Sequence, residues 1–214
     1  MMVVRQVKNS IPDDQESANT FIFNLLINRT MSLTPSTMLP LDTLAPEFTL
    51  TDTVSGETMN LNALKGERGT VIMFICNHCP FVVHVNPMLV ELGQTYQEKG
   101  IGFIAISSND VENYPQDAPH LMKKKAQEEG YPFPYLFDET QEIAKAYNAA
   151  CTPDLYLFDG SLKLVYRGQL DDSRPGNGLP LNGNDLRNAI EALLNDQNIA
   201  SVQKPSIGCN IKWI

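Results

Sequence analysis

Two cysteines lie close together in a chain that contains four, and they are the residues best suited to chemistry. Cys76 and Cys79 are separated by Asn77 and His78 and are followed directly by Pro80. This spacing fits three kinds of site: a redox dithiol that cycles between two thiols and a disulfide, half of a zinc site, or a buried unreactive pair. Which of the three applies depends on the elements that hold the pair.

The elements on either side of the pair favour redox chemistry. Residues 70–75 form a continuous apolar run, which predicts a strand buried on both faces. After Pro80, apolar residues recur every three or four positions as far as residues 99–100, which predicts a helix. Unpaired N–H groups and the macrodipole at a helix N-terminus stabilise an anion, so we expect this junction to favour a Cys76 thiolate. Cys79 follows about one turn later, within reach of a disulfide.

His78 and the remaining possible ligands separate the redox interpretation from the zinc interpretation. A partly protonated His78 would stabilise the thiolate further, so we assign it a pKa-tuning role; the alternative is an exposed histidine of little effect. A zinc site needs four ligands, and the other candidates, His84, Cys151 and Cys209, are far apart in the sequence. We therefore predict no metal and no cofactor. Cys151 and Cys209 are expected to be small buried residues without a catalytic role.

Composition narrows the class of protein and its partners. A chain of 214 residues with 43% hydrophobic residues predicts one compact domain with tails. A formal net charge of −9 argues against nucleic acid as a partner. No apolar run approaches the roughly 20 residues that cross a bilayer. With few cysteines and no recognisable export pattern, we expect a cytoplasmic protein that does not bind membranes.

The order of predicted elements indicates an α/β domain over residues 39–198. Residues 1–38 are expected to be a disordered extension, with Met31 as an alternative translation start, and residues 199–214 a polar tail. The predicted elements are a hairpin over 47–61, strands over 70–75, 101–107 and 131–138, helices over 80–99, 117–129, 139–149 and 185–194, and a hairpin over 153–168. Asp117 is the expected cap of the second helix and Gly130 its end. This order predicts parallel inner strands, an antiparallel edge and helices on both faces, with the site at the carboxyl ends of strands.

Several motifs together resemble a known family. The strand-CxxC-helix unit and "CTPDLYLFD" resemble the thioredoxin fold. With "NHCPFVVHV", "YRGQLDDSRPGNG" and "PSIGCNIKW", the chain resembles the peroxiredoxin-like thioredoxin proteins of the AhpC/TSA (redoxin) superfamily over residues 39–213. The resemblance implies a mixed central sheet with an N-terminal hairpin. It also implies that Thr152 and Pro153 contact the substrate, with Pro153 after a cis bond, an isomer that proline makes accessible.

Departures from the family pattern bear on the reaction. Cys79 corresponds to the peroxide-reducing cysteine of the family pattern P-x-x-x-T-x-x-C, but Cys76 and Ile72 replace its threonine and proline. This favours thiol-disulfide exchange, in which Cys76 attacks and Cys79 resolves, with a protein or small molecule carrying a disulfide or dithiol as partner. The alternatives are an antioxidant thiol peroxidase and a non-catalytic or metal-binding module. The strand over 70–75 also lacks the buried carboxylate that accepts the resolving thiol's proton in thioredoxins.

Overall fold

A computed structural model describes residues 33–214 of the chain. The alternative start at Met31 and most of the predicted extension therefore lie outside the described residues. Within residues 33–214, no helix combines the length and the hydropathy needed to span a bilayer.

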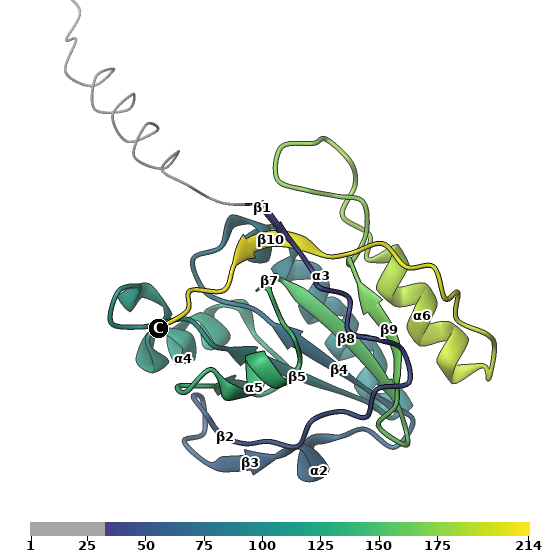
Figure 1. Ribbon diagram of the computed structural model, residues 1–214, viewed down its shortest axis with the longest axis horizontal. Helices are drawn as coiled ribbons and strands as arrows, with labels where there is room; N and C mark the ends of the chain where they lie inside the picture. The colour runs from purple at the N-terminus through teal and green to yellow at the C-terminus, as the bar shows by residue number, and fades with distance from the viewer. Residues whose placement is uncertain (1–32) are drawn as a thin grey trace, which may run out of the picture. The chain divides into compact units, whose positions relative to one another are not determined.

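A seven-stranded mixed sheet forms the centre of the domain, with its strands in the order β3-β2-β6-β5-β4-β8-β9 (Figure 1). β4 pairs in parallel with β5, and β5 with β6, while β8 and β9 extend the sheet antiparallel on the other side of β4. The strands are β2 (Thr49–Asp52), β3 (Thr58–Asn60), β4 (Gly69–Phe74), β5 (Ile101–Ser107), β6 (Tyr135–Phe137), β8 (Asp154–Asp159) and β9 (Leu164–Gly168). The predicted parallel centre and both predicted hairpins, β2-β3 and β8-β9, are confirmed.

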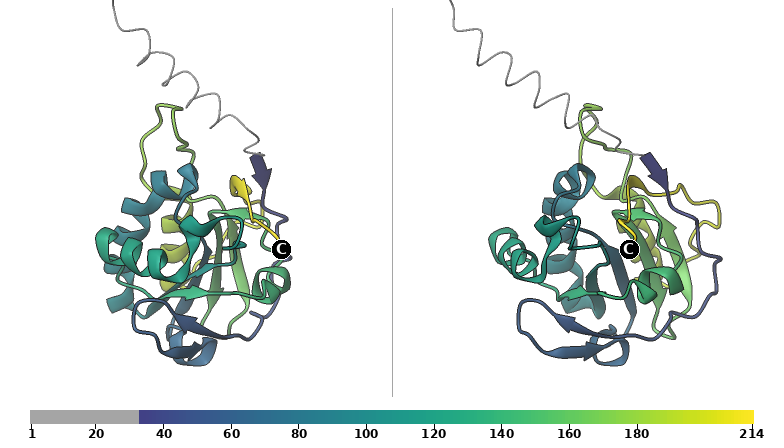
Figure 2. Two further views of the ribbon diagram at one scale, coloured as in Figure 1. Left: turned by 90° about the vertical axis from the view of Figure 1, so that its left-hand side faces the viewer. Right: turned by 60° about the vertical axis from the view of Figure 1, so that its left-hand side comes forward.

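Helices cover both faces of this sheet, as Figure 2 shows. All six residues of β4 are buried, and successive side chains point to opposite faces. Val71 and Met73 pack in one core with α3, α4 and α6, whereas Ile72 and Phe74 pack in a second core with α2 and residues around α5. The helices are α2 (Leu61–Leu64), α3 (Pro80–Tyr96), α4 (Pro119–Glu129), α5 (Glu142–Ala146) and α6 (Asn184–Leu194), with short 3-10 turns η1 (Gln97–Lys99) and η2 (Pro115–Asp117).

The predicted cap of α4 is wrong, although its predicted end is right. Gly130 ends the helix in the left-handed conformation, with a φ of 68°, which glycine adopts without strain. The N-cap, however, is Ala118, and Asp117 closes η2 instead. The Asp117 carboxylate accepts a hydrogen bond from the backbone N–H of Asn77, so it belongs to the cysteine site and not to the helix.

A second, three-stranded sheet differs from the predicted tails. β10 (Ile207–Asn210) lies between β1 (Leu33–Pro35) and β7 (Cys151–Thr152), antiparallel to both. Figure 1 shows β1 and the yellow β10 crossing the same end of the domain, close to β7. Part of the expected polar tail is therefore a paired strand, and it brings Cys209 opposite Thr152 in the register.

Candidate active site

The two cysteines lie where β4 turns into α3, and it is Cys79, not Cys76, that stands at the N-terminus of the helix. Cys79 is the N-cap of α3, in an extended conformation, and Pro80 is the first helical residue. The carbonyl of Cys79 accepts the first helical hydrogen bond, from the N–H of Val83, at 2.9 Å. Cys76 lies three residues before the cap. The partial positive charge of the helix N-terminus therefore lies at Cys79 rather than at Cys76.

A cluster of sulfur atoms surrounds Cys79. Its Sγ lies 3.0 Å from the Sγ of Cys209, and the side chain of Cys76 is close enough to lower the pKa of Cys79. Cys76 contacts the Thr152 hydroxyl, with Sγ and Oγ1 3.4 Å apart. All three cysteines are buried: the exposed fraction is 2% for Cys76, 0% for Cys79 and 4% for Cys209. Cys79 thus stands between two possible sulfur partners.

The electrostatics of the cluster place the negative charge of the reduced site on Cys79. Hydrogen bonds from the thiols of Cys209 and Cys76, with the amides of Val82 and Cys209, hold the pKa of Cys79 well below its usual value. The Thr152 carbonyl, 3.1 Å from Cys79 Sγ, acts in the opposite sense because it accepts a hydrogen bond only from a protonated thiol. The groups that stabilise the Cys79 thiolate outnumber this single acceptor.

The pKa of Cys76 is shifted in the direction opposite to the one we predicted. The hydrogen bond to Cys79 raises it most, followed by burial and by the negative charges of Asp117 and Cys79. A protonated Cys76 that donates to an ionised Cys79 satisfies both sulfur atoms. The expectation that the helix N-terminus holds Cys76 as a thiolate is therefore wrong, because the cap position belongs to Cys79.

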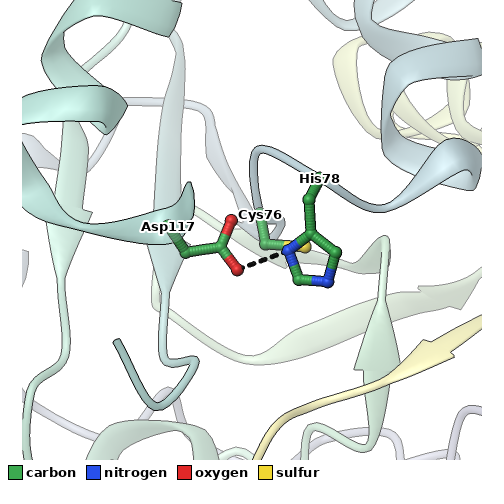
Figure 3. Close-up of side chains that lie close together, drawn as sticks. All are labelled: Cys76, His78 and Asp117. Carbon is green, nitrogen blue, oxygen red and sulfur yellow. Dashed lines mark hydrogen bonds and ion pairs between the residues drawn. The ribbon is translucent and has the colours of Figure 1, made fainter. Parts of the chain in front are cut away.

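Asp117 is a part of the site that sequence reasoning missed. Its carboxylate is fully buried and accepts hydrogen bonds from the Asn77 backbone N–H and the Asn109 side chain, both at 2.8 Å. Its Oδ2 lies 2.6 Å from Nδ1 of His78, as Figure 3 shows, with the sulfur of Cys76 beside the ring. The carboxylate thus places His78 next to Cys76. The pKa-tuning role of His78 stays a prediction.

Cys76, His78 and Asp117 also form a possible metal-binding group. One ligand atom from each lies within 4.8 Å of the others. However, Nδ1 of His78 already faces the carboxylate, so a metal ion would have to break that contact to use both groups. His84, the histidine considered as a zinc ligand in the sequence, lies on α3 with Nε2 3.0 Å from the hydroxyl of Ser173, outside this group. The contacts therefore fit a hydrogen-bond network better than a metal centre.

Thr152 and Pro153 lie against the cysteines, and the bond between them is cis, as expected. Both polar groups of Thr152 contact sulfur: its hydroxyl faces Cys76 and its carbonyl faces Cys79. Pro153 also lines a cleft of about 280 Å³ together with Phe81, His84, Leu170 and Arg174, among others. Thr152 is paired with β10 of the same chain, so a peptide that bound along this strand would meet an occupied edge.

Cys209 and Cys151 reach the site to different degrees. Cys209 is brought within contact distance of Cys79 by β10, against the expectation that it has no part in the site. Cys151 lies on β7 next to Thr152, but its sulfur faces the carbonyl of Pro153 at 3.5 Å. The sequence signal for a strand at Cys209 is the alternation of apolar residues with small or polar residues in "SIGCNI", which is typical of a short strand. No local signal indicates that this strand pairs with β7, 55 or more residues earlier.

The fold and the paired cysteines define a thioredoxin-fold protein with a CxxC motif. A similar fold occurs in the thioredoxin domain of a thiol-disulfide oxidoreductase from Bacteroides vulgatus, which is 22% identical with a TM-score of 0.57 and covers 73% of this chain and 99% of that one. More specifically, the chain belongs to the AhpC/TSA family, whose model matches residues 41–167. The match leaves out β10 and Cys209.

Of two further relatives, one is described as uncharacterized and the other is named for a thiol-disulfide exchange activity. An uncharacterized conserved protein from Geobacillus kaustophilus is 58% identical, with a TM-score of 0.85, and the alignment covers 86% of this chain and 98% of that one. The thiol-disulfide oxidoreductase ResA of Bacillus thuringiensis is 29% identical over 121 residues, which is 56% of this chain. The match spans 65% of the length of ResA.

Proposed function

We propose that this protein is a thiol-disulfide oxidoreductase that cycles Cys76 and Cys79 between dithiol and disulfide. The observation that carries the proposal is the placing of both sulfur atoms on Thr152 at the junction of β4 and α3: Sγ of Cys76 lies 3.4 Å from its hydroxyl oxygen and Sγ of Cys79 lies 3.1 Å from its carbonyl oxygen. The similarity to proteins named thiol-disulfide oxidoreductases supports the same reaction class. The partner is a protein or small molecule that carries a disulfide or a dithiol.

In the reductive direction, a Cys76 thiolate attacks one sulfur of the substrate disulfide. A bond between Cys76 and the substrate forms, the substrate S–S bond breaks, and the departing thiolate takes up the proton that Cys76 gave up. The Cys79 thiolate then attacks the Cys76 sulfur, the Cys76–Cys79 bond forms, and the second substrate sulfur leaves. Two electrons pass from the protein to the substrate.

The charge distribution suits this division of roles. Of the two CxxC cysteines, Cys76 keeps a small exposed fraction, 2%, whereas Cys79 has none and its sulfur contacts Thr152 and Cys209, so we assign the attack on the substrate to Cys76. The low pKa of Cys79 gives a resolving thiolate without a separate base, which compensates for the absence of a carboxylate in β4. Because the pKa of Cys76 is raised, only a small fraction of it is thiolate at neutral pH. We therefore expect the rate of disulfide reduction to rise with pH through the neutral range.

Trapping of the mixed disulfide tests the roles. A Cys79→Ser variant, incubated with a protein disulfide such as oxidised insulin and quenched by alkylation, should accumulate a covalent adduct at Cys76. A Cys76→Ser variant should not, and Cys151→Ser should behave as the unmodified protein. Adducts of similar yield in both CxxC variants, or an adduct found only with Cys76→Ser, would overturn the assignment.

Peroxide reduction at Cys79 is the second candidate function, favoured by the AhpC/TSA membership and by the stabilised Cys79 thiolate. The thiolate would attack the O–O bond, forming a sulfenic acid and releasing water or an alcohol. Full burial of Cys79 counts against it. Peroxide consumption that persists in Cys76→Ser and is lost in Cys79→Ser would favour this reaction over thiol-disulfide exchange.

The cellular location expected from the cysteine content stays a prediction. Fractionation of cells, combined with alkylation of thiols before lysis, would show both the compartment and the redox state of the pair there. A protein found cytoplasmic and mainly as the dithiol would agree with a net reductant. Recovery outside the cytoplasm would contradict the prediction.

A further inference from the structure

We propose that Cys209 is a third redox cysteine, which takes over the disulfide from Cys76 and holds it as a Cys79–Cys209 bond. The proposal rests on the thiol-disulfide exchange proposed above and adds one residue and one step to it. It starts from the 3.0 Å contact between the sulfur atoms of Cys79 and Cys209. A disulfide has its sulfur atoms about 2.05 Å apart, so bond formation requires an approach of about 1 Å.

The second observation is the way in which β10 holds Cys209 in place. Cys209 is the register partner of Thr152 on β7 and of Leu33 on β1, so its strand is paired along both edges. The residue before it, Gly208, packs so closely on Thr152 that a Cβ atom there would collide with the Thr152 carbonyl oxygen. Glycine at this position lets the strand approach the site. The sulfur contact therefore arises from a built arrangement of backbone and not from a loose tail.

Further hydrogen bonds tie β10 to the same network that positions the CxxC motif. The side chain of Asn109 donates to Asp117, at 2.8 Å, and its carbonyl accepts from the backbone N–H of Lys212, also at 2.8 Å. The N–H of Asp110 donates to the carbonyl of Lys212 at 2.8 Å. The loop after β5 thus holds both Asp117, on the Cys76 side, and the segment just beyond Cys209.

The step itself balances without an outside oxidant. Starting from the Cys76–Cys79 disulfide, the Cys209 sulfur attacks Cys79; the bond between Cys79 and Cys209 forms and the bond between Cys76 and Cys79 breaks. The electron pair of the broken bond goes to Cys76, which takes the proton that Cys209 gives up. The protein stays at the same oxidation level. The result is a free Cys76 thiol beside a buried disulfide.

The charges around Cys209 favour its attack on Cys79 once the Cys76–Cys79 disulfide has formed. In the reduced site, the pKa of Cys209 is raised mainly by its hydrogen bond to Cys79 and, after burial, by the charge on Cys79. Both effects of Cys79 disappear once it is neutral in the Cys76–Cys79 disulfide. Lys212, whose positive charge lowers the pKa of Cys209, remains. Ionisation of Cys209 therefore becomes easier after the first disulfide has formed.

Cys151 provides the matched control for this proposal. It is also buried and lies on β7 beside Thr152, but its sulfur contacts the Pro153 carbonyl and not a sulfur atom. If closeness to the site were enough for disulfide exchange, Cys151 and Cys209 would exchange equally well. The sulfur contact predicts that only Cys209 exchanges.

Disulfide mapping under native conditions tests the proposal. The fully reduced full-length protein is oxidised with one equivalent of oxidised glutathione, quenched with acid, alkylated and mapped by peptide mass spectrometry. We expect a Cys79–Cys209 disulfide beside the Cys76–Cys79 disulfide in the unmodified protein and in Cys151→Ser. In Cys76→Ser, Cys79–Cys209 should be the main intramolecular disulfide.

The outcomes separate this proposal from the proposed function. If only Cys76–Cys79 is found and Cys209 is alkylated in every oxidised molecule, the third-cysteine proposal is overturned while the exchange function stands. If no disulfide involving Cys76 or Cys79 forms, both are overturned. The mapping of the unmodified protein decides the question even if a variant fails to fold.

Discussion

At the scale of single residues, the distribution of protons among the three sulfur atoms decides the chemistry. Cys79 receives donors from several directions, whereas Cys76 is a donor to Cys79 and lies near the negative charge of Asp117. A nucleophile that is protonated at rest reacts slowly but is protected from unspecific oxidation, because only the thiolate reacts. Asp117 and Cys79 therefore control the reactivity of Cys76 through charge.

We predict that Asp117→Asn lowers the pKa of Cys76, because the substitution removes a nearby negative charge and keeps the size of the side chain. Cys76 should then be alkylated by iodoacetamide faster than in the unmodified protein at neutral pH. The rate as a function of pH, with modified Cys76 quantified by mass spectrometry, measures the shift.

The control for this substitution is Asp110→Asn in the same loop. The Asp110 carboxylate contacts Glu112 and Asn113 and does not contribute to the shift of Cys76. Its substitution should leave the alkylation profile of Cys76 unchanged. An unchanged or slower reaction in Asp117→Asn would contradict the electrostatic account of the site.

At the scale of elements, the position of β10 determines how accessible the cysteines of the CxxC motif are. The strand lies on the Thr152 edge and places Cys209 over Cys79, so the buried state of Cys79 depends on this pairing. The start of α3 contributes the other half, because Cys79 is its extended N-cap and Pro80 its first helical residue. Access to the CxxC motif is thus a property of two elements that are distant in the sequence.

We predict that Gly208→Ala increases the reactivity of Cys79 and costs about 1 to 3 kcal/mol of stability, a usual range for overpacking. A methyl group at this position collides with the Thr152 carbonyl, so β10 must move away from β7. Alkylation of Cys79 in the reduced protein should become faster, and the midpoint of urea unfolding should fall.

Ile207→Ala is the control on the same strand. Ile207 is 36% exposed, and its truncation removes atoms without adding any near Thr152. Cys79 should remain as slow to react as in the unmodified protein. Equal labelling of Cys79 in both variants would show that the fit of Gly208 is not what keeps the strand closed.

At the scale of the whole molecule, one buried carboxylate makes stability depend on pH. Asp154 begins β8 directly after Pro153 and is fully buried, with its carboxylate accepting from the hydroxyl of Tyr156 at 3.1 Å and the N–H of Ala150 at 3.3 Å. Burial raises its pKa from 3.8 to about 6 in spite of these donors. The folded state therefore holds this proton more tightly than the unfolded state does.

We predict that Asp154 destabilises the fold by about 3 kcal/mol at neutral pH relative to its protonated form. Well below pH 3.8 both states are protonated and the effect vanishes. As the pH rises from 3.8 through 6, the unfolded state ionises before the folded state does, so the folded state loses stability. Asp154→Asn should thus gain stability over the unmodified protein between pH 4 and 7.

Urea unfolding of both proteins at several pH values measures this difference. Other titrating groups contribute equally to the two proteins, so their effects cancel in the comparison. A constant difference in the free energy of unfolding across this range would show that Asp154 is not the titrating group.

Most of the central sheet was predictable from the sequence, whereas the second sheet was not. The runs around β4 and β5 are apolar and continuous, and the turn residues around Gly160 mark the hairpin β8-β9 clearly. β1 and β10 are only three and four residues long and pair with partners far away in the chain. Such pairing depends on tertiary contacts, which local patterns do not carry.

The same difference applies within the candidate site. The CxxC motif and Pro153 were identifiable because their spacing and residue types are distinctive. Asp117 was assigned to a helix cap because a capping aspartate and a buried site aspartate look alike in one sequence. Which of Cys76 and Cys79 is the thiolate depends on where α3 begins. The ends of helices and strands are the least certain part of any sequence-based assignment.

The small sheet also has a practical consequence for work with this protein. Because β1 and β10 are neighbours, changes to residues 33–35 and to residues 207–210 act on the same small sheet, which also holds Thr152 of β7. Only four residues separate Asn210 from an affinity tag fused after Ile214. Rates measured with tagged and tag-free protein should therefore be compared before any value is ascribed to the native protein, and a shortened version ending after α6 lacks β10 and Cys209.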